Sequence, residues 1–152
     1  MVVEFVRGDL FRADVEAIVN AVNCVGVMGK GIALQFKKTF PENFQQYKRA
    51  CDAGTVQPGS MFIFDNRSRG TPLYLINFPT KRHWRNASRL DDIRSGLAAL
   101  VADVQRLGIK SIAIPALGCG CGGLDWGIIK PLISQSFAQM PDVRVLVFEP
   151  LS

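Results

Sequence analysis

The sequence has few of the residues that bind metals. His83 is its only histidine, and its four cysteines, which form no Cys-x-x-Cys pair, are Cys24, Cys51, Cys119 and Cys121. Structural zinc sites need clusters of such ligands at short spacings, so we expect no metal and no other cofactor. The cysteines lie in apolar or glycine-rich surroundings, and no signal peptide is recognisable. We therefore expect free thiols in a cytoplasmic protein.

Long apolar runs and the phosphate-binding motif of nucleoside triphosphatases are also missing. No apolar run approaches the roughly 20 residues that a membrane-spanning helix needs, so we expect a soluble protein. The motif GxxxxGK[ST] does not occur. Its absence argues against hydrolysis of nucleoside triphosphates.

What is present is the composition of one ordinary globular domain. The chain has 152 residues, of which 48% are hydrophobic and 20% charged, and this is enough to bury an apolar core without disulfides or metal. We expect a single domain over residues 1–152. The last strand-like run ends close to the C-terminus, which leaves a further downstream domain as an open alternative. The net charge of +5 favours an anionic partner.

Strand-like and helical patterns alternate along the chain. This alternation indicates an α/β fold with helices covering a sheet whose strands are partly parallel. Short β-rich runs are expected at residues 2–6, 15–22, 61–64, 73–76, 111–115 and 143–148. Helices are expected over residues 31–38, over residues 42–53, after Ser88 and after Asp125.

The last two helices carry sequence signals for their ends. Ser88 and Asp91 have the spacing of an acidic capping box, and Gly108 is expected to end that helix. In the helix after Asp125, Pro131 is acceptable only in the first turn. The residues expected to face inward there are Ile128, Ile129, Leu132, Ile133 and Phe137.

Two glycine-rich segments, residues 20–31 and 118–124, each follow an apolar strand and precede a helix. We do not interpret either of them as the GxGxxG turn of a dinucleotide-binding Rossmann unit. Glycine allows backbone N–H groups to approach an anion, and the helix N-terminus behind the loop adds partial positive charge. Both loops would lie at the carboxyl ends of strands, where open α/β sheets bind ligands. The pair predicts a diphosphate held from two sides, and the alternative is that the glycines only make tight turns.

Three polar side chains lie near the expected ligand site. Asn20 and Asn23 are at the junction of a strand and the first glycine-rich segment. Turn chemistry favours Asn20 as a brace for the loop, whereas the donors and acceptor of Asn23 suit ribose hydroxyls. Asp9 follows the first strand, and it either accepts a hydrogen bond from an adenine amino group or caps a turn.

The densest charge feature is residues 77–89, which contain four basic side chains and no acid. The candidate nucleic-acid contacts there are Arg82, His83, Trp84, Arg85 and Arg89. Basic groups alternating with an aromatic ring suit single-stranded nucleic acid. The alternative is a solvated basic loop with Trp84 packed against the body of the domain. Lys81 is either a phosphate contact or a nucleophile towards an anomeric or carbonyl carbon.

With these features, the chain resembles the macrodomain family. The resemblance rests on GDL at residues 8–10, NAVN at 20–23, GVMGKGIALQF at 26–36, PALGCGCGGLDW at 115–126 and the final VLVFEP. The NFPTKRHWRNAS and MGKGIA segments are similar to the DarG group of macrodomains. This resemblance implies a three-layer α/β/α sandwich with a central mixed, largely parallel sheet. It also implies removal of ADP-ribose from thymine bases in single-stranded DNA, as an antitoxin to a DarT-type toxin.

The resemblance also implies roles for individual residues. Asp9 and Leu10 would meet adenine, Asn23 would meet the distal ribose, and Lys81 would be catalytic, with Asn23 assisting it. Asn20 is a further candidate ligand contact. Residues that would bind the diphosphate are Gly29, Lys30, Gly31, Ile32, Ala33, Gly118, Cys119, Gly120, Cys121, Gly122, Gly123 and Leu124. Reaction through Lys81 needs its amine in the neutral form, which a neighbouring cation such as Arg82 would favour.

One position departs from a related human glycohydrolase of the family, which pairs its lysine with an aspartate in the second glycine loop. The matching position here is Gly122, and Asp125 is expected to cap its helix. Lys81 would then act without a carboxylate, with a substrate phosphate or a water taking the proton role. Two alternatives stay open: a non-catalytic ADP-ribose reader, or a hydrolase of protein-linked ADP-ribose or of O-acetyl-ADP-ribose.

Overall fold

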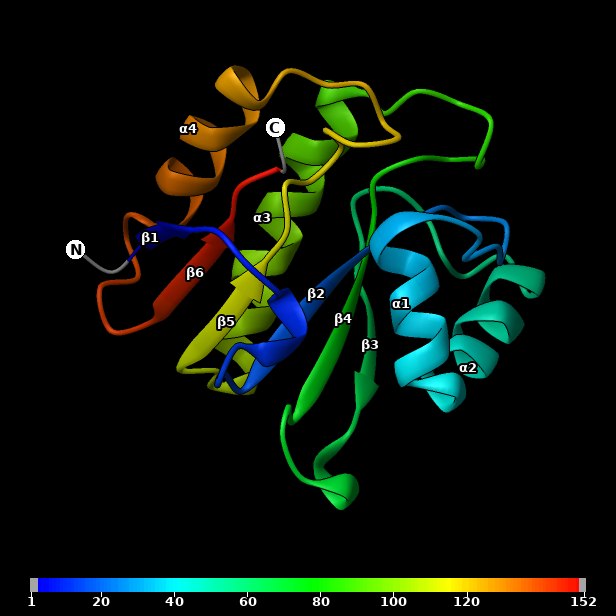
Figure 1. Cartoon of the computed structure of the whole chain (residues 1–152), viewed down its shortest axis with the longest axis horizontal. Coiled ribbons are helices and arrows are strands. Elements are labelled where there is room, and N and C mark those ends of the chain that lie inside the picture. Colours follow the sequence, from blue (N-terminus) through cyan, green and yellow to red (C-terminus); the bar gives the residue numbers. More distant parts are fainter. Residues whose placement is uncertain (1–2, 151–152) are drawn as a thin grey trace.

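A computed structural model describes residues 3–150 as a six-stranded sheet with four α-helices (Figure 1). The strands are β1 (Val3–Val6), β2 (Ala17–Val22), β3 (Phe62–Asp65), β4 (Tyr74–Pro79), β5 (Ser111–Ile114) and β6 (Arg144–Phe148). The helices are α1 (Gly31–Thr39), α2 (Pro41–Asp52), α3 (Leu90–Leu107) and α4 (Trp126–Phe137), and short 3-10 helices are η1 (Leu10–Arg12) and η2 (Arg67–Arg69). All six strand predictions and all four helix predictions are confirmed within a few residues, except that residue 2 of the first predicted strand lies outside the described residues.

The strand order β1-β6-β5-β2-β4-β3 places β2, β4 and β5 side by side in the sheet. All neighbouring pairs are parallel except β3 and β4, which are antiparallel. The expected mixed, largely parallel sheet is therefore confirmed. Because parallel strands end at the same edge, the loops after β2, β4 and β5 meet there, at the top of Figure 1.

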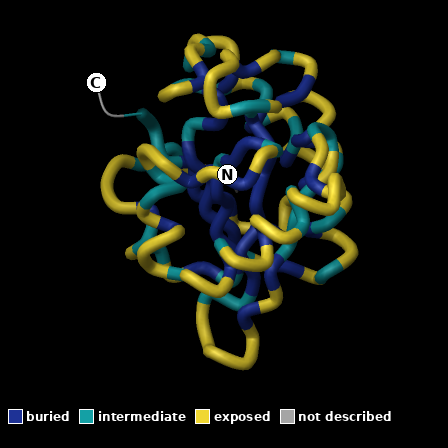
Figure 2. Tube along the Cα trace, turned by 90° about the vertical axis from the view of Figure 1, so that its right-hand side faces the viewer, coloured by how far each residue is buried: buried dark blue, intermediate teal, exposed yellow. Residues whose placement is uncertain are grey.

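Alternating side chains along the strands fill two cores on opposite faces of the sheet. Ala17 and Val19 of β2 pack on the α3–α4 side, whereas Ile18 and Val22 pack on the α1–α2 side. Near-continuous apolar strands are typical of parallel sheets that are covered on both faces. The buried strands lie in the middle of the domain with exposed turns around them (Figure 2), and the result is a three-layer α/β/α sandwich.

The start of α3 differs from the prediction. Its N-cap is Arg89, with no side-chain capping bond, so the capping box of Ser88 and Asp91 is wrong. Ser88 lies one residue too early, and its N–H donates instead to the carbonyl of Gly122 (2.9 Å). The predicted end is confirmed, because Gly108 caps the helix in the left-handed conformation at φ 66°.

In α4, the N-cap is predicted correctly and the proline position is not. The Asp125 carboxylate accepts from the N–H of Gly127 (3.0 Å). Pro131 lies in the second turn, not the first. Proline has no N–H to donate to the carbonyl of Gly127 four residues earlier. Both residues are exposed, so water can bond to that carbonyl instead. Ile128 is 49% exposed and does not face inward.

Two further sequence predictions concern cysteines and membrane segments. The cysteines are free thiols, and burial raises the pKa of Cys24 and of Cys119 to about 11. Both are therefore neutral at physiological pH. Among the helices of residues 3–150, none has the length and apolar composition needed to cross a bilayer.

Candidate functional site

The first glycine-rich loop presents open backbone donors. It joins β2 to α1, and α1 begins at Gly31 with Lys30 as an N-cap that makes no side-chain capping bond. The first N–H groups of a helix have no intrahelical acceptor, and they carry the positive end of the helix dipole. Gly31 has φ +58°, a conformation that favours glycine. This end of α1 therefore has the geometry of an anion site.

Asn20 lies behind this loop. Its side chain is completely buried, and its Nδ2 donates to Asn77 Oδ1 (3.2 Å) and contacts Met28 Sδ at 3.9 Å. The side chain is not accessible from the surface in this conformation, and a direct contact with ADP-ribose stays a prediction. The bracing alternative agrees with these bonds, because Met28 belongs to the loop.

Asn23 also braces the loop, a role that turn chemistry predicts for Asn20. The Oδ1 atom of Asn23 accepts from the N–H of Val25 (3.1 Å), the N–H of Val27 (3.4 Å) and the hydroxyl of Tyr47 (2.8 Å). Its Nδ2 donates one hydrogen to the carbonyl of Val27 (2.8 Å). The second Nδ2 hydrogen is what this side chain can offer to a ribose.

Asp9 caps η1, and its Oδ1 accepts from the N–H of Phe11 (3.0 Å). Leu10 is buried in the core on the α1–α2 side. The capping role of Asp9 is thus present in the structure. A contact of Asp9 and Leu10 with adenine stays a prediction.

The second glycine-rich loop, residues 118–124, follows β5 and closes on itself. The N–H of Leu124 donates to the carbonyl of Gly118 (2.9 Å), and Gly118 and Gly123 have φ of +75° and +77°. Among residues 3–150, the N–H groups of Gly120 and Cys121 have no protein acceptor. They are available to an anion, as a phosphate-binding loop requires.

Gly122 has room for no other residue. A Cβ placed there would collide with the Ser88 hydroxyl and lie 2.5 Å from the carbonyl oxygen of Gly118. A carboxylate side chain at position 122 therefore does not fit, which gives a structural reason for glycine at this position. Asp125 is engaged as a helix cap. Neither position supplies a carboxylate partner for Lys81.

Residues 80–89 join the two glycine-rich loops. The carbonyl of Arg82 accepts from the N–H of Cys24 (3.3 Å), and the N–H of Ser88 donates to Gly122. Lys81 therefore lies beside the end of β2, next to Asn23. Its Nζ donates to the carbonyl of Trp84 (3.2 Å). Among residues 3–150, no ion pair joins Lys81 to a carboxylate.

Arg82 has a partner that the local sequence does not show. Its Nε and Nη2 donate to the two carboxylate oxygens of Asp92, both at 3.2 Å. The bond to Asp92 raises the pKa of Arg82. The acid that residues 77–89 lack comes from α3, so Arg82 offers less charge to Lys81 and to a DNA strand than its sequence position suggests.

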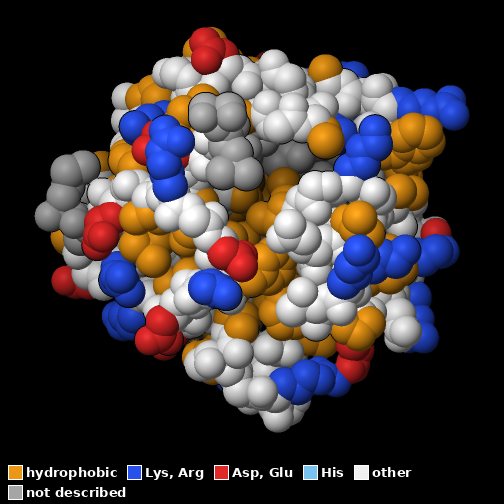
Figure 3. Space-filling model, in the orientation of Figure 1, with side chains coloured by type: hydrophobic (Ala, Val, Ile, Leu, Met, Phe, Trp, Pro, Cys, Tyr) orange, Lys and Arg blue, Asp and Glu red, His pale blue; other side chains and the backbone are white. Residues whose placement is uncertain are grey.

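Trp84 projects from the surface, with 46% of it exposed. The guanidinium of Arg85 lies 4.6 Å from its ring centre, and the ring of His83 lies 5.2 Å away. The alternative in which Trp84 packs against the body of the domain is therefore wrong. Arg89 is exposed at the N-cap of α3. Basic and hydrophobic side chains occur together along the right-hand rim of Figure 3, where this loop lies in Figure 1.

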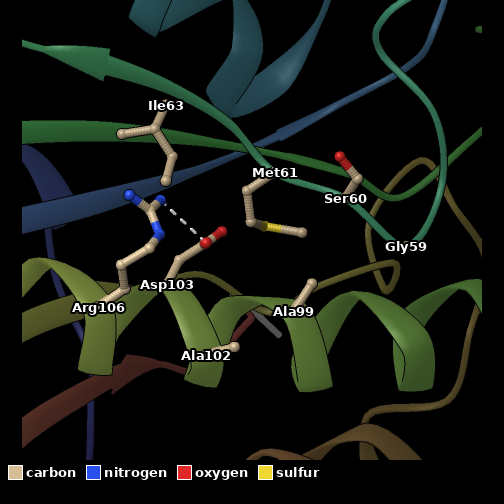
Figure 4. Close-up of a pocket in the computed structure, with 8 residues that line it drawn as sticks. All are labelled: Gly59, Ser60, Met61, Ile63, Ala99, Ala102, Asp103 and Arg106. Atoms are coloured by element: carbon tan, nitrogen blue, oxygen red, sulfur yellow. Dashed lines mark hydrogen bonds and ion pairs between the residues drawn. The ribbon is translucent and has the colours of Figure 1, made fainter.

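A surface groove of about 380 Å³ lies elsewhere, between β3 and α3 (Figure 4). Polar and apolar groups line it in similar measure, and Arg106 Nη2 donates to Asp103 Oδ1 (3.1 Å) at one end. The residues around it are Gly59, Ser60, Met61, Ile63, Ala99, Ala102, Asp103 and Arg106. None of these is a predicted site residue, so the groove is separate from the candidate site.

The fold and the paired glycine loops define an α/β/α ligand-binding module. The chain belongs to the macrodomain family, since the Macro domain model matches residues 19–133. It is 50% identical over 147 residues to the DNA ADP-ribosyl glycohydrolase of Thermus aquaticus, covering 97% of this chain and 41% of the relative. The chain thus spans about two-fifths of that relative's length.

Solved structures agree with this assignment. The macrodomain of Thermus aquaticus DarG matches with a TM-score of 0.94 at 50% identity, over 97% of this chain and 98% of that one. Thermosipho africanus DarTG in complex with ADP-ribose matches with a TM-score of 0.90 at 36% identity, over 98% of this chain and 42% of that one. The domain is therefore similar to the DarG macrodomains.

Proposed function

We propose that this chain is a DNA ADP-ribosyl glycohydrolase that removes ADP-ribose from thymidine bases in single-stranded DNA. The observation that carries the proposal is that residues 80–89, with a basic aromatic surface and Lys81, are bonded to both open glycine loops. A relative with 50% identity is named DNA ADP-ribosyl glycohydrolase, which supports modified DNA as the substrate. A relative with 37% identity is a fusion of a DNA ADP-ribosyl transferase and a DNA ADP-ribosyl glycohydrolase, which supports an antitoxin role against a DarT-type toxin. A cytoplasmic location and a single macrodomain over residues 1–152 are part of the same proposal.

In this proposal the edge of the sheet is divided between the parts of the substrate. The diphosphate lies between the N-terminus of α1 and the loop of residues 118–124, because both present unpaired N–H groups. Asp9 and Leu10 take the adenine end, and the free Nδ2 hydrogen of Asn23 takes the distal ribose. The DNA strand crosses Trp84, Arg85 and Arg89, where bases can stack and phosphates meet guanidinium groups.

Lys81 is the proposed catalytic residue, because its backbone follows β4 and bonds to the end of β2, one residue before Asn23 at the ribose end. The neutral amine either attacks the anomeric carbon or polarises it from close range. In both routes the bond from that carbon to the thymine nitrogen breaks, and its electron pair leaves with the base, which takes up a proton. Water supplies the hydroxyl of the released ADP-ribose, and the proton passes through a substrate phosphate or a water.

A side-by-side assay of three substrates tests the proposal. The purified domain is incubated with a single-stranded oligonucleotide that carries ADP-ribosylated thymidine, with a protein carrying ADP-ribose on a carboxylate, and with O-acetyl-ADP-ribose. We expect release from the oligonucleotide to be at least tenfold faster than from the other two. Tight binding of ADP-ribose without release from any substrate would identify a reader, and faster release from protein or ester would identify a different hydrolase.

The DNA surface predicts a salt dependence that distinguishes its arginines. Affinity for the modified oligonucleotide should fall as salt rises, and Arg85→Ala should flatten this dependence by roughly 0.7 in the log–log slope per phosphate contact. Arg82→Ala should flatten it less, because Asp92 already pairs with Arg82. Arg106→Ala, at the far end of α3, is the control. An unchanged slope in Arg85→Ala would place the DNA strand elsewhere.

A further inference from the structure

Helix α2 contributes no residue to the glycine loops, yet one of its side chains holds Asn23. Tyr47 is completely buried, and its hydroxyl lies 2.8 Å from both the backbone carbonyl and the Oδ1 of Asn23. Burial raises the pKa of Tyr47, so the phenol stays protonated and acts as a donor. Its single hydrogen is shared between two acceptors of the same residue.

These bonds fix the orientation of the Asn23 carboxamide. With Oδ1 directed at Tyr47 and at the N–H groups of Val25 and Val27, the NH₂ end has to point the other way. One of its hydrogens goes to the Val27 carbonyl. Asn23 therefore presents a donor, not an acceptor, to a ligand oxygen.

The same helix makes a second bond to the region behind the loop. Asn43 lies one turn before Tyr47 on the same buried face of α2. Asn43 and Asn77 exchange side-chain hydrogen bonds of 2.8 and 3.2 Å, and Asn77 also accepts from Asn20, which contacts Met28 in the loop. α2 thus supports the loop at Asn23 and, through this network, at Met28.

We propose that Tyr47 is a positioning residue for the reaction, acting through Asn23. The inference rests on the proposed function, in which Asn23 holds the distal ribose whose anomeric carbon faces Lys81. Without the Tyr47 hydroxyl, the Asn23 carboxamide loses one of its fixed contacts and can rotate. The ribose is then still bound through the diphosphate loops, but it is held less often in the reactive position.

Tyr47→Phe tests this inference, since it removes the hydroxyl and keeps the ring. We expect kcat to fall about tenfold, with KM and the Kd for ADP-ribose changing less than about threefold. The side-chain amide resonances of Asn23 should shift in nuclear magnetic resonance spectra. Tyr74→Phe is the matched control, because Tyr74 lies in the core on the other face of the sheet. It should match the wild type in each measurement.

A double-mutant cycle separates positioning from a general structural effect. If Tyr47 acts through Asn23, Tyr47→Phe should lower kcat much less in an Asn23→Ala background than in the wild type. Full additivity, or wild-type kcat with unmoved Asn23 resonances in Tyr47→Phe, would overturn the inference. A wild-type domain that releases no ADP-ribose would refute the proposed function instead. The Asn23 resonances and the ADP-ribose affinity would still decide whether Tyr47 orients Asn23.

Discussion

Replacement of Lys81 by alanine is expected to abolish turnover and leave ADP-ribose binding nearly intact. A positioned acid, base or nucleophile contributes about 10²–10⁴-fold to a rate. The N–H of Lys81 bonds to Val22, the residue before Asn23, and this places Lys81 at the proposed ribose end. We therefore expect kcat on the modified oligonucleotide to fall by about 10³-fold. Isothermal titration calorimetry should give a Kd for ADP-ribose within about threefold of the wild type, because both diphosphate loops are unchanged.

Lys81→Arg separates chemistry from attraction. Arginine keeps the positive charge and does not become neutral in proteins, so it should not rescue turnover if a neutral amine reacts. Recovery of the rate in Lys81→Arg would mean that Lys81 only attracts the substrate. The control is Lys110→Ala, which lies before β5 at the opposite edge of the sheet and should keep the wild-type rate. Wild-type turnover in Lys81→Ala would remove Lys81 from the mechanism.

Gly122→Asp is expected to damage the domain and not to add a carboxylate partner for Lys81. The new Cβ would overlap the Ser88 hydroxyl and the carbonyl of Gly118. It would also bring a charge into a buried position. Overpacking costs about 1–3 kcal/mol, and an unpaired buried charge costs about 3–5 kcal/mol, so we expect the free energy of unfolding to fall by about 3 kcal/mol or more. ADP-ribose binding should weaken at least tenfold as the loop is displaced.

Denaturant unfolding and calorimetry measure these two effects. Gly127→Ala in the first turn of α4 is the control for stability, since a Cβ there meets only ordinary contacts of 3.5 Å or more, and alanine favours a helix. Ser88→Gly combined with Gly122→Asp should restore little, because the clash with the Gly118 backbone persists. A folded Gly122→Asp variant with wild-type turnover would contradict the account of this loop.

The sequence predicted the layers of the fold because its signals are local. Apolar strands, a left-handed Gly108 and the Asp125 cap each depend on a few neighbouring residues, and all are present in the structure. The predicted first-turn position of Pro131 and the predicted capping role of Ser88 are wrong for a different reason. A proline in a second turn is tolerated on an exposed helix face, and Ser88 bonds to a loop more than 30 residues away.

The site was predictable only in part, because several of its contacts link distant segments. The glycine loops and Lys81 follow strand ends, and the parallel sheet brings such ends together. The pairing of Arg82 with Asp92 depends on how α3 packs against the end of β4. The bond from Tyr47 to Asn23 crosses 24 residues. An isolated tyrosine in an amphipathic helix gives no sign of such a bond in the sequence.

We propose that this domain removes ADP-ribose from thymidine in single-stranded DNA and that Lys81 is the catalytic residue. The most direct measurement is mass spectrometry of an oligonucleotide with one ADP-ribosylated thymidine, after incubation with the wild type or with Lys81→Ala. We expect the wild type to yield the unmodified oligonucleotide and an equal amount of free ADP-ribose, and Lys81→Ala to leave the modified mass unchanged. An intact modified oligonucleotide after incubation with a wild-type domain that binds ADP-ribose would contradict the proposed activity.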